Sequence, residues 1–254
     1  MQTETLKYLL ESDYMMETYI FRHGETNYQQ GKVNIDEAHD LTSDGIRVVK
    51  NSTNNLANKL KHNHPILISS SPFGRCLHTS KIIKDCLNNK VSNVVDIDID
   101  NNLGEVENFK WDLFYPLVIG GHAEYNGDRF IVNKSLTNPQ NASPIKYFRD
   151  DSTHNLSPMA KKTLPSEYAK KISEFEKYSS VIGRLNSKLD SLKDSLQINI
   201  LSTHEGLTGE LIKQISKQDE AFLNRGKYFG VETQNGLIIP YNCQEDAIST
   251  SEYK

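Results

Sequence analysis

The sequence is poor in cysteine and has no long apolar run. Its three cysteines, Cys76, Cys86 and Cys243, are too few and too scattered for a disulfide framework, and they form no C-x-x-C pair typical of structural zinc sites. No apolar run approaches the roughly 20 residues that span a bilayer. Residues 1–17 carry acidic side chains instead of the basic start and apolar middle of a signal peptide. These absences predict a soluble, reduced, cytoplasmic protein.

The sequence also lacks a large excess of either charge. Its 29 basic and 33 acidic residues give a formal net charge of −4. Because nucleic acids and anionic membranes attract basic surfaces, this balance argues against both as general partners. With 254 residues, the chain is long enough to bury a core as one large α/β domain or two small ones.

Short β-prone runs alternate with amphipathic helical patterns along most of the chain. Such alternation is typical of parallel strands joined by helices that cover both faces of the sheet. We therefore expect an α/β fold, a three-layer sandwich with a mainly parallel central sheet flanked by helices. The expected strands are 18–21, 66–70, 94–97, 198–202 and 237–239, and the expected helices are about 43–60, 72–87, 166–195 and 207–215.

The segment from about Val106 to Pro165 interrupts this alternation. It contains several prolines and glycines and shows little periodicity. We interpret it as an inserted cap segment that packs over the sheet edge. On this interpretation, residues 1–254 form a single domain with a substrate-cap insertion at about 106–165.

Polar clusters follow the expected strands at the points where they end. They are residues 22–26 (RHGET), 69–75 (SSSPFGR), 103–105 (LGE) and 202–206 (STHEG). Because ligands bind outside the carboxyl ends of the strands in open α/β sheets, we expect these clusters to meet in one site. Together they supply two imidazoles, two guanidiniums and a carboxyl group.

This set of groups suits phosphoryl transfer. Guanidinium groups bind phosphate oxygens through paired N–H donors and keep their charge at all relevant pH values. A neutral imidazole is a competent nucleophile, and a covalent intermediate divides one difficult step into two easier ones. A carboxylic acid can protonate the leaving oxygen and then activate water as a base. The clusters therefore predict a phosphoryl-transfer site that needs no metal ion.

Residues 22–26 (RHGET) resemble the signature of the histidine phosphatase (phosphoglycerate mutase-like) superfamily. Other blocks follow in the family's order. Residues 41–45 resemble its L-T-x-x-G helix start, and residues 70–79 resemble its S-S-P-x-x-R-x-x-x-T block. Residues 103–105 are similar to its L-x-E element, and residues 203–204 carry its second histidine. The resemblance leaves the middle of the chain unmatched.

The resemblance implies a role for each matched residue. His23 would be the nucleophile that becomes phosphorylated. Arg22, Arg75 and His204 would hold the phosphoryl group during transfer. Glu105 would be the proton donor. No cofactor and no metal ligand are implied.

Two positions depart from the family's pattern. Thr26 and Gln29 lie where the family often contacts phosphate or substrate, but the family usually has asparagine at the position of Gln29. Its second histidine is usually followed by glycine, whereas Glu205 stands between His204 and Gly206 here. Glu205 adds negative charge near an anion site, so we include it among the substrate-binding residues as one that tunes or weakens phosphate affinity.

Two side chains near these positions need a separate interpretation. Glu107 follows Glu105 by two residues, and a strand would point both side chains to the same face, so either carboxyl could be the proton donor. Cys76 is adjacent to Arg75, but on the expected helix it should point away from the site and into the core.

The combined expectation is an enzyme that hydrolyses phosphomonoesters of a small phosphorylated metabolite through a phosphohistidine. The first alternative is a mutase that returns the phosphoryl group to another hydroxyl of the substrate. Family mutases usually carry paired arginines in the insertion, whereas only the isolated Arg129 and Arg149 occur here. The second alternative is a non-catalytic protein that binds a phosphorylated ligand on the same fold.

Overall fold

The structure of the protein is a computed structural model. Most of the expected insertion lies outside the residues that it describes, as does Gln29. The structure describes residues 17–27, 39–60, 64–91, 93–105, 121–125, 128–132, 166, 170, 176–192, 197–217, 222–234, 237–241, 244 and 247–249.

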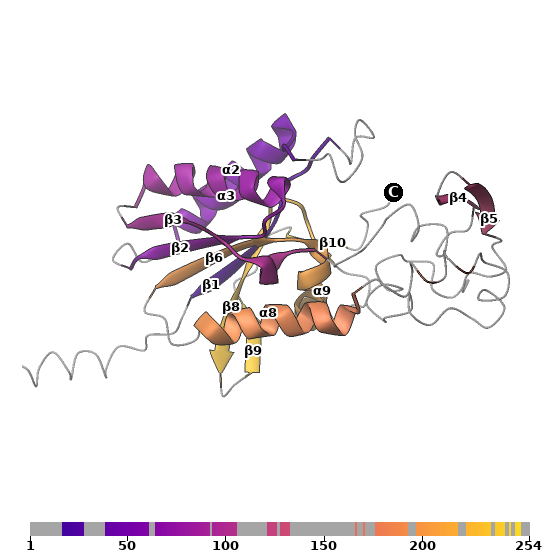
Figure 1. Cartoon of the computed structure of the whole chain (residues 1–254). Coiled ribbons are helices and arrows are strands. Elements are labelled where there is room, and N and C mark those ends of the chain that lie inside the picture. Colours follow the sequence, from indigo (N-terminus) through magenta and orange to yellow (C-terminus); the bar gives the residue numbers. More distant parts are fainter. Residues whose placement is uncertain are drawn as a thin grey trace, which may run out of the picture.

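A six-stranded sheet forms the middle layer of the molecule (Figure 1). Its strand order is β3-β2-β6-β1-β8-β9. The first four strands in this order run parallel, β8 is antiparallel to β1, and β9 is antiparallel to β8. The mainly parallel sheet is thus confirmed. The strands are β1 (Thr18–Arg22), β2 (Ile66–Ser70), β3 (Val94–Ile99), β6 (Ile198–Thr203), β8 (Tyr228–Gln234) and β9 (Leu237–Tyr241).

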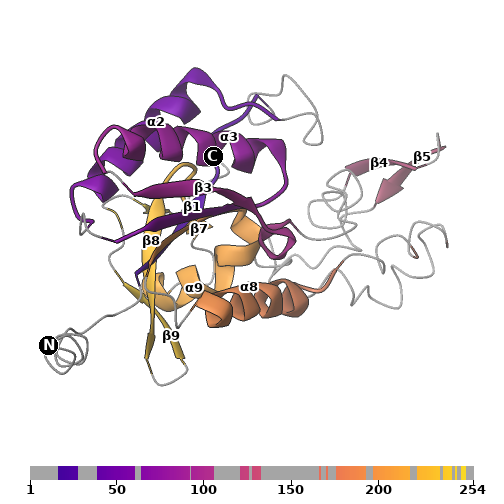
Figure 2. The same cartoon turned by 60° about the vertical axis from the view of Figure 1, so that its left-hand side comes forward.

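Helices cover both faces of the sheet, which gives the three layers that were expected. Helices α2 (Ser43–Ala57) and α3 (Gly74–Asn88) lie on one face, and α8 (Tyr178–Leu192) and α9 (Glu205–Ser216) lie on the other (Figures 1 and 2). Because side chains alternate along a strand, β1 contributes to both interfaces. Tyr19 and Phe21 join the core under α2 and α3, whereas Ile20 joins the core under α8 and α9.

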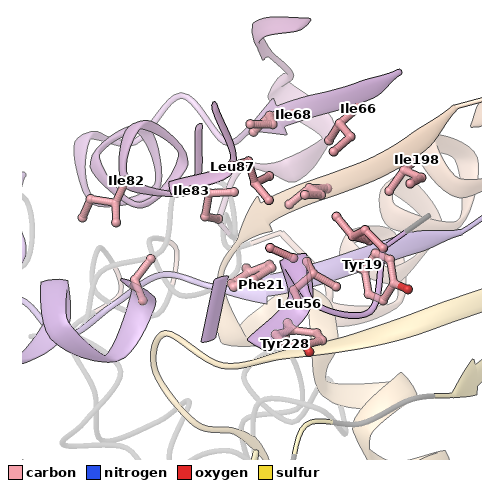
Figure 3. Packing of buried hydrophobic residues seen from close by; sticks show 14 of the residues in the cluster. Tyr19, Phe21, Leu56, Ile66, Ile68, Ile82, Ile83, Leu87, Ile198 and Tyr228 are labelled. Carbon is pink, nitrogen blue, oxygen red and sulfur yellow. The ribbon is translucent and has the colours of Figure 1, made fainter. Parts of the chain in front are cut away.

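The core beneath α2 and α3 is built around aromatic rings (Figure 3). Tyr228, the first residue of β8, stacks on Phe21 with a distance of 5.0 Å between ring centroids. Tyr19 meets the ring of Tyr228 edge-on at 5.8 Å. Burial of each such side chain contributes about 1.5–3 kcal/mol to folding. The core thereby fixes β1, which carries the 22–26 cluster at its end.

Local sequence signals explain where the helices begin. The Thr42 hydroxyl accepts a hydrogen bond from Gly45 N at 3.0 Å, so Thr42 is the N-cap of α2, which begins at Ser43 like the expected helix 43–60. Helix α3 begins at Gly74 after the N-cap residue Phe73. Pro72 therefore precedes α3 and does not occupy its first turn, contrary to the sequence interpretation.

Several elements differ from the sequence expectation. Strand β8 was not predicted, although it separates β1 from β9 in the sheet. A second small sheet, β7 (Phe222–Leu223) with β10 (Ile248–Ser249), was also missed. Of the long helix expected at 166–195, the structure shows α8 and helical backbone at Ser166 and Lys170.

The expected insertion contains regular structure. Strands β4 (Gly121–Tyr125) and β5 (Asp128–Val132) form an antiparallel hairpin that is a sheet of its own. The remainder of 106–165 lies outside the described residues, so the cap and the single-domain organisation stay predictions. Within the part of the chain that the structure describes, no helix has the length and apolarity needed to cross a membrane.

The packing of α2 against the 22–26 cluster predicts opposite effects for two alanine substitutions. A Cβ at Gly45 would lie 2.4 Å from the carbonyl oxygen of Glu25, whereas a Cβ at Gly183 in α8 would meet no atom within 4 Å. We expect Gly45→Ala to lower the free energy of unfolding by about 1–3 kcal/mol, because the backbone of Glu25 must move. Gly183→Ala should raise it by up to about 1 kcal/mol, because alanine favours the helix. Urea denaturation measures both, and an equal effect of the two would contradict this packing.

Candidate active site

Three neighbouring parallel strands bring the main polar clusters to one edge of the sheet. Arg22 ends β1, Ser71 follows β2 and His204 follows β6. The backbone ladder continues past the strand ends, since His23 N donates to Thr203 O at 3.0 Å and Ser71 N donates to Ser202 O at 3.0 Å. The side chains expected to meet at this edge therefore do so.

His23 is held as a neutral imidazole of one tautomer. Its Nδ1 lies 2.8 Å from the carbonyl oxygen of Gly24. Because a carbonyl only accepts, Nδ1 carries the proton and Nε2 carries the free lone pair. Burial, followed by the positive charges of Arg75 and Arg22, holds the pKa of His23 well below its usual 6.5. The Nε2 atom of His23 thus carries an unprotonated lone pair at neutral pH.

His204 is neutral as well, but it is the opposite tautomer. Arg75 Nη2 donates to His204 Nδ1 at 3.2 Å, and a guanidinium cannot accept, so the proton of His204 lies on Nε2. His204 Nε2 donates to the hydroxyl of Ser71 at 2.9 Å. Burial, with the charge of Arg75 as the next cause, lowers the pKa of His204 well below 6.5. The rings of His23 and His204 are 5.4 Å apart between centroids.

The side chain of Cys76 contacts the site, contrary to expectation. Its Sγ lies 3.3 Å from Nε2 of His204, although the sequence interpretation pointed it away. The interpretation of Cys76 as a buried residue is correct, and burial raises the pKa of its thiol to about 12. Cys76 therefore packs against His204 as a neutral thiol.

Arg75 and Glu105 form an ion pair beside His204. Arg75 Nη2 donates to Glu105 Oε2, and this carboxylate oxygen lies 3.6 Å from Nδ1 of His204. Glu105 follows the short 3-10 helix η2 (Asn101–Leu103) and is not in a strand, so the expected strand alternation with Glu107 does not apply to it. The structure places the Glu105 carboxyl beside Arg75 and His204, whereas Glu107 lies outside the described residues, so the choice of proton donor between them stays a prediction.

Residues of β7 and α9 hold the guanidinium of Arg22. Its Nη1 donates to the carbonyl oxygen of Leu223 at 2.7 Å and lies 3.4 Å from Oε2 of Glu205. Glu205 is the first residue of α9, where the helix dipole favours a carboxylate. The sequence predicted Arg22 and Glu205 near the same anion site, but it did not predict that they pair with each other.

Other contacts fix the backbone of the 22–26 cluster. Gly226 N donates to the carbonyl oxygens of both Arg22 and His23, and the φ of Gly226 is +73°, which favours glycine. The Thr79 hydroxyl accepts from Gly24 N at 3.2 Å. Thr79 belongs to the 70–79 block, which carried a sequence signal, whereas no sequence signal indicated Gly226.

The remaining predicted substrate-binding residues are Thr26 and Gln29. Thr26 is fully buried, and its backbone forms an isolated β-bridge with Leu41. Gln29 lies outside the described residues. Contact of either residue with a substrate stays a prediction.

The site combines two guanidiniums, two neutral imidazoles and two carboxylates at one sheet edge. Arg22 and Arg75 are nearly inaccessible to solvent, and each has a carboxylate as its neighbour. Such an arrangement can bind a phosphoryl group that displaces the carboxylates from the guanidiniums. Among the residues whose positions are given, no cluster of three or more histidine, cysteine, aspartate or glutamate side chains could hold a metal ion.

Comparisons with known proteins bear on the family and on the fold. Residues 18–132 match the model of the histidine phosphatase superfamily (branch 1). No curated protein matches the sequence. The fold is similar to those of solved phosphatases and a mutase at 14–15% identity, a level that carries information on the fold alone.

Three solved structures illustrate the likeness. Mycobacterial glucosyl-3-phosphoglycerate phosphatase with VO3 has a TM-score of 0.54 and 14% identity, with 90% of this chain and 100% of that chain covered. Phosphoglycerate mutase from Bacillus anthracis has a TM-score of 0.54 and 14% identity, with 91% and 93% covered. The α-ribazole phosphatase from Shigella flexneri has a TM-score of 0.52 and 15% identity, with 92% and 98% covered.

The two buried neutral histidines predict that the protein loses stability in acid. The pKa values of His23 and His204 lie below 6.5 in the folded state, so below this pH the unfolded chain binds protons that the folded chain does not. Stability should therefore fall as the pH drops below 6.5. Each such histidine should lower the free energy of unfolding by about 1.4 kcal/mol as the pH falls from about 7.5 to about 5.5.

Urea denaturation of His204→Gln at the two pH values measures this contribution. The variant should lose about 1.4 kcal/mol less than the wild type over the same interval, because it lacks one buried imidazole. Asn51→Gln, at an exposed residue of α2 that does not titrate, serves as the control and should keep the acid sensitivity of the wild type. Equal acid sensitivity in all three proteins would contradict the neutral state of His204.

Proposed function

We propose that this chain, whose residues 18–132 match the model of the histidine phosphatase superfamily, hydrolyses phosphomonoesters of a small metabolite through a phosphohistidine. The geometry of His23 carries this proposal. Its Nδ1 proton is bound by the Gly24 carbonyl, so the lone pair on Nε2 is available beside two guanidiniums. The reaction proposed needs no metal ion and no cofactor.

The first step forms a bond between His23 Nε2 and the phosphorus atom and breaks the bond from phosphorus to the ester oxygen. Arg22 and Arg75 bind the phosphoryl oxygens, which takes the place of their pairs with Glu205 and Glu105. Once its pair with Arg75 is replaced, the Glu105 carboxylate takes up the proton of the monoanionic phosphate ester and donates it to the leaving oxygen, which departs as an alcohol. Both imidazoles are neutral before the reaction. The new bond to phosphorus places a positive charge on His23, and the negative charge of the bound phosphoryl group offsets it.

The second step returns the enzyme to its starting state. Water attacks the phosphorus atom, Glu105 accepts a proton from that water, and the bond from phosphorus to His23 Nε2 breaks. Inorganic phosphate is the product. The proton that Glu105 gains in this second step leaves with the phosphate, so Glu105 ends as a carboxylate. Arg22, Arg75 and His204 hold the phosphoryl group throughout, so both transition states use the same cations.

Phosphoryl transfer to a second hydroxyl, as in a mutase, is the alternative within the same family. It is favoured by the likeness of the fold to a phosphoglycerate mutase, and it is disfavoured by the lack of paired arginines in the insertion. Release of phosphate without an isomerised product would support hydrolysis.

We also propose a cytoplasmic location, because Cys76 and Cys86 are free thiols, as is usual in a reducing compartment.

Substitution of the nucleophile tests the phosphohistidine. With an aryl phosphate as substrate, His23→Ala should lower kcat by about 1,000-fold or more, because no other group can form the covalent intermediate. EDTA should leave the wild-type rate unchanged, and vanadate should inhibit as an analogue of the transition state. Phosphate release is the measurement, with His64→Ala as a control of full activity.

The outcomes separate the candidate functions. Full activity of His23→Ala would exclude this mechanism, and loss of activity in EDTA would indicate a metal enzyme. Wild-type protein that binds vanadate without turning over any phosphate ester of a metabolite panel would indicate a non-catalytic binding protein.

Substitution of Glu205 should raise the affinity of the site for phosphate. In the resting site, the carboxylate of Glu205 competes with a phosphoryl group for Arg22. Removal of a competing charge worth about 1 kcal/mol should lower the inhibition constant of inorganic phosphate about fivefold in Glu205→Gln. Asp96→Asn, which makes the same charge change at an exposed position of β3, is the matched control. Weaker phosphate inhibition in Glu205→Gln would show that Glu205 positions Arg22 and does not compete for it.

A further inference from the structure

One guanidinium from α8 binds almost every backbone carbonyl of the loop that carries Glu105. Arg184 Nη1 donates to Asn102 O at 3.0 Å and to Asn101 O and Gly104 O at 3.3 Å each. Arg184 Nη2 donates to the carbonyl oxygen of Glu105 itself at 3.3 Å. The loop between β3 and the insertion thus takes its shape around a single side chain.

The remaining carbonyl of this loop is bound from within the site. The Thr203 hydroxyl, next to His204 in the chain, donates to Leu103 O at 2.8 Å. The side chain of Leu103 is fully buried in the core beneath α8 and α9. All five carbonyls from Asn101 to Glu105 therefore have side-chain donors, four of them from Arg184.

Arg184 also contacts the point where the chain returns from the insertion. Its Nε and Nη2 donate to the two carboxylate oxygens of Glu176 at 2.8 and 2.7 Å. Both side chains are largely buried, with exposed fractions of 19% and 13%. Residues 106–175 lie between the two partners Glu105 and Glu176, so Arg184 joins the two ends of the segment that contains the insertion.

We propose that Arg184 is the positioning residue of the proton donor. By binding the backbone at Glu105, it holds the Glu105 carboxyl between Arg75 and His204, where the leaving oxygen of a bound phosphate ester would lie. This inference rests on the proposed function. It extends that function to Arg184, a residue outside the sequence blocks that resemble the family. The bidentate pair with Glu176 fixes the guanidinium plane and so the direction of its other donors.

A second tie between the same helix and loop provides a matched control. Lys188 Nζ, one turn after Arg184 in α8, lies 2.7 Å from Oδ2 of Asp100. It attaches the start of the loop to α8 but does not contact the backbone at Glu105. If the site only needs the loop attached to α8, loss of Arg184 and loss of Lys188 should have the same kind of effect. If Arg184 positions the proton donor, only its loss should change the dependence on the leaving group.

Dependence on the leaving group distinguishes positioning from stability. A leaving group that departs readily needs no proton, whereas a poor one does, and general acid catalysis contributes about 100-fold or more. In Arg184→Lys, which keeps the charge but not the planar fork, hydrolysis of phenyl phosphate should fall about 100-fold. Both rates are compared as kcat/KM, which reports the steps up to the phosphohistidine and leaves out the later role of Glu105 as a base. Hydrolysis of dinitrophenyl phosphate should stay within about threefold of the wild type by this measure.

Four further variants complete the experiment. Glu105→Gln should show the same leaving-group dependence as Arg184→Lys, and the double variant should lose little more than either single one, because both changes remove the same acid. Lys188→Met should treat both substrates alike. Glu176→Gln, which retains Arg184, should show the same pattern at smaller amplitude and serves if Arg184→Lys does not fold.

The results separate this inference from the proposed function. Equal losses on both substrates in Arg184→Lys and Glu176→Gln, alongside a leaving-group effect in Glu105→Gln, would overturn the role of Arg184 and leave the phosphatase intact. Additive losses in the double variant would overturn it as well. A wild-type protein that hydrolyses neither these two substrates nor any phosphate ester of the metabolite panel would refute the proposed function first.

Discussion

The buried guanidiniums of Arg22 and Arg75 require counter-charges, and the arrangement of the site depends on how the fold supplies them. A charge removed from water without a partner costs several kcal/mol. The fold meets this cost with Glu205 at the start of α9 and with Glu105 after η2. Glu205 follows β6 and Glu105 follows β3, and β2 lies between these two strands in the sheet. The site can therefore fold without a ligand while it keeps two cations ready for an anion.

The same cations determine the state of the imidazoles. Burial and the adjacent positive charges lower the pKa values of His23 and His204, so neither ring adds to the charge that must be compensated. The hydrogen-bond partners then select the tautomers. The Gly24 carbonyl keeps the proton of His23 on Nδ1, and Arg75 keeps the proton of His204 on Nε2. The lone pair on Nε2 of His23 and the N–H donor on Nε2 of His204 thus follow from fixed neighbours.

Local signals explain which parts were predictable. Strand β2 and the start of α2 agree with the sequence expectation, because an apolar run and an N-cap threonine act within a few residues. Strand β8 was missed because its sequence, YFGVETQ, contains a glycine and polar residues, and its place in the sheet comes from pairing with β1 and β9. The contact of Cys76 with His204 depends on how α3 sits on β6, which no local pattern encodes.

The contacts that organise the site join residues distant in sequence, and this limits prediction most strongly for Arg184. Arg184 lies in a helix whose sequence pattern shows only an amphipathic face, yet its partners are carbonyl groups about 80 residues earlier. Backbone acceptors leave no trace in the identity of the residues that supply them. A phosphoryl group that draws Arg75 from Glu105 would leave that carboxyl held only through its own backbone. Orientation of the acid during the reaction would then rest on the contacts of this loop with α8, the helix that follows the insertion.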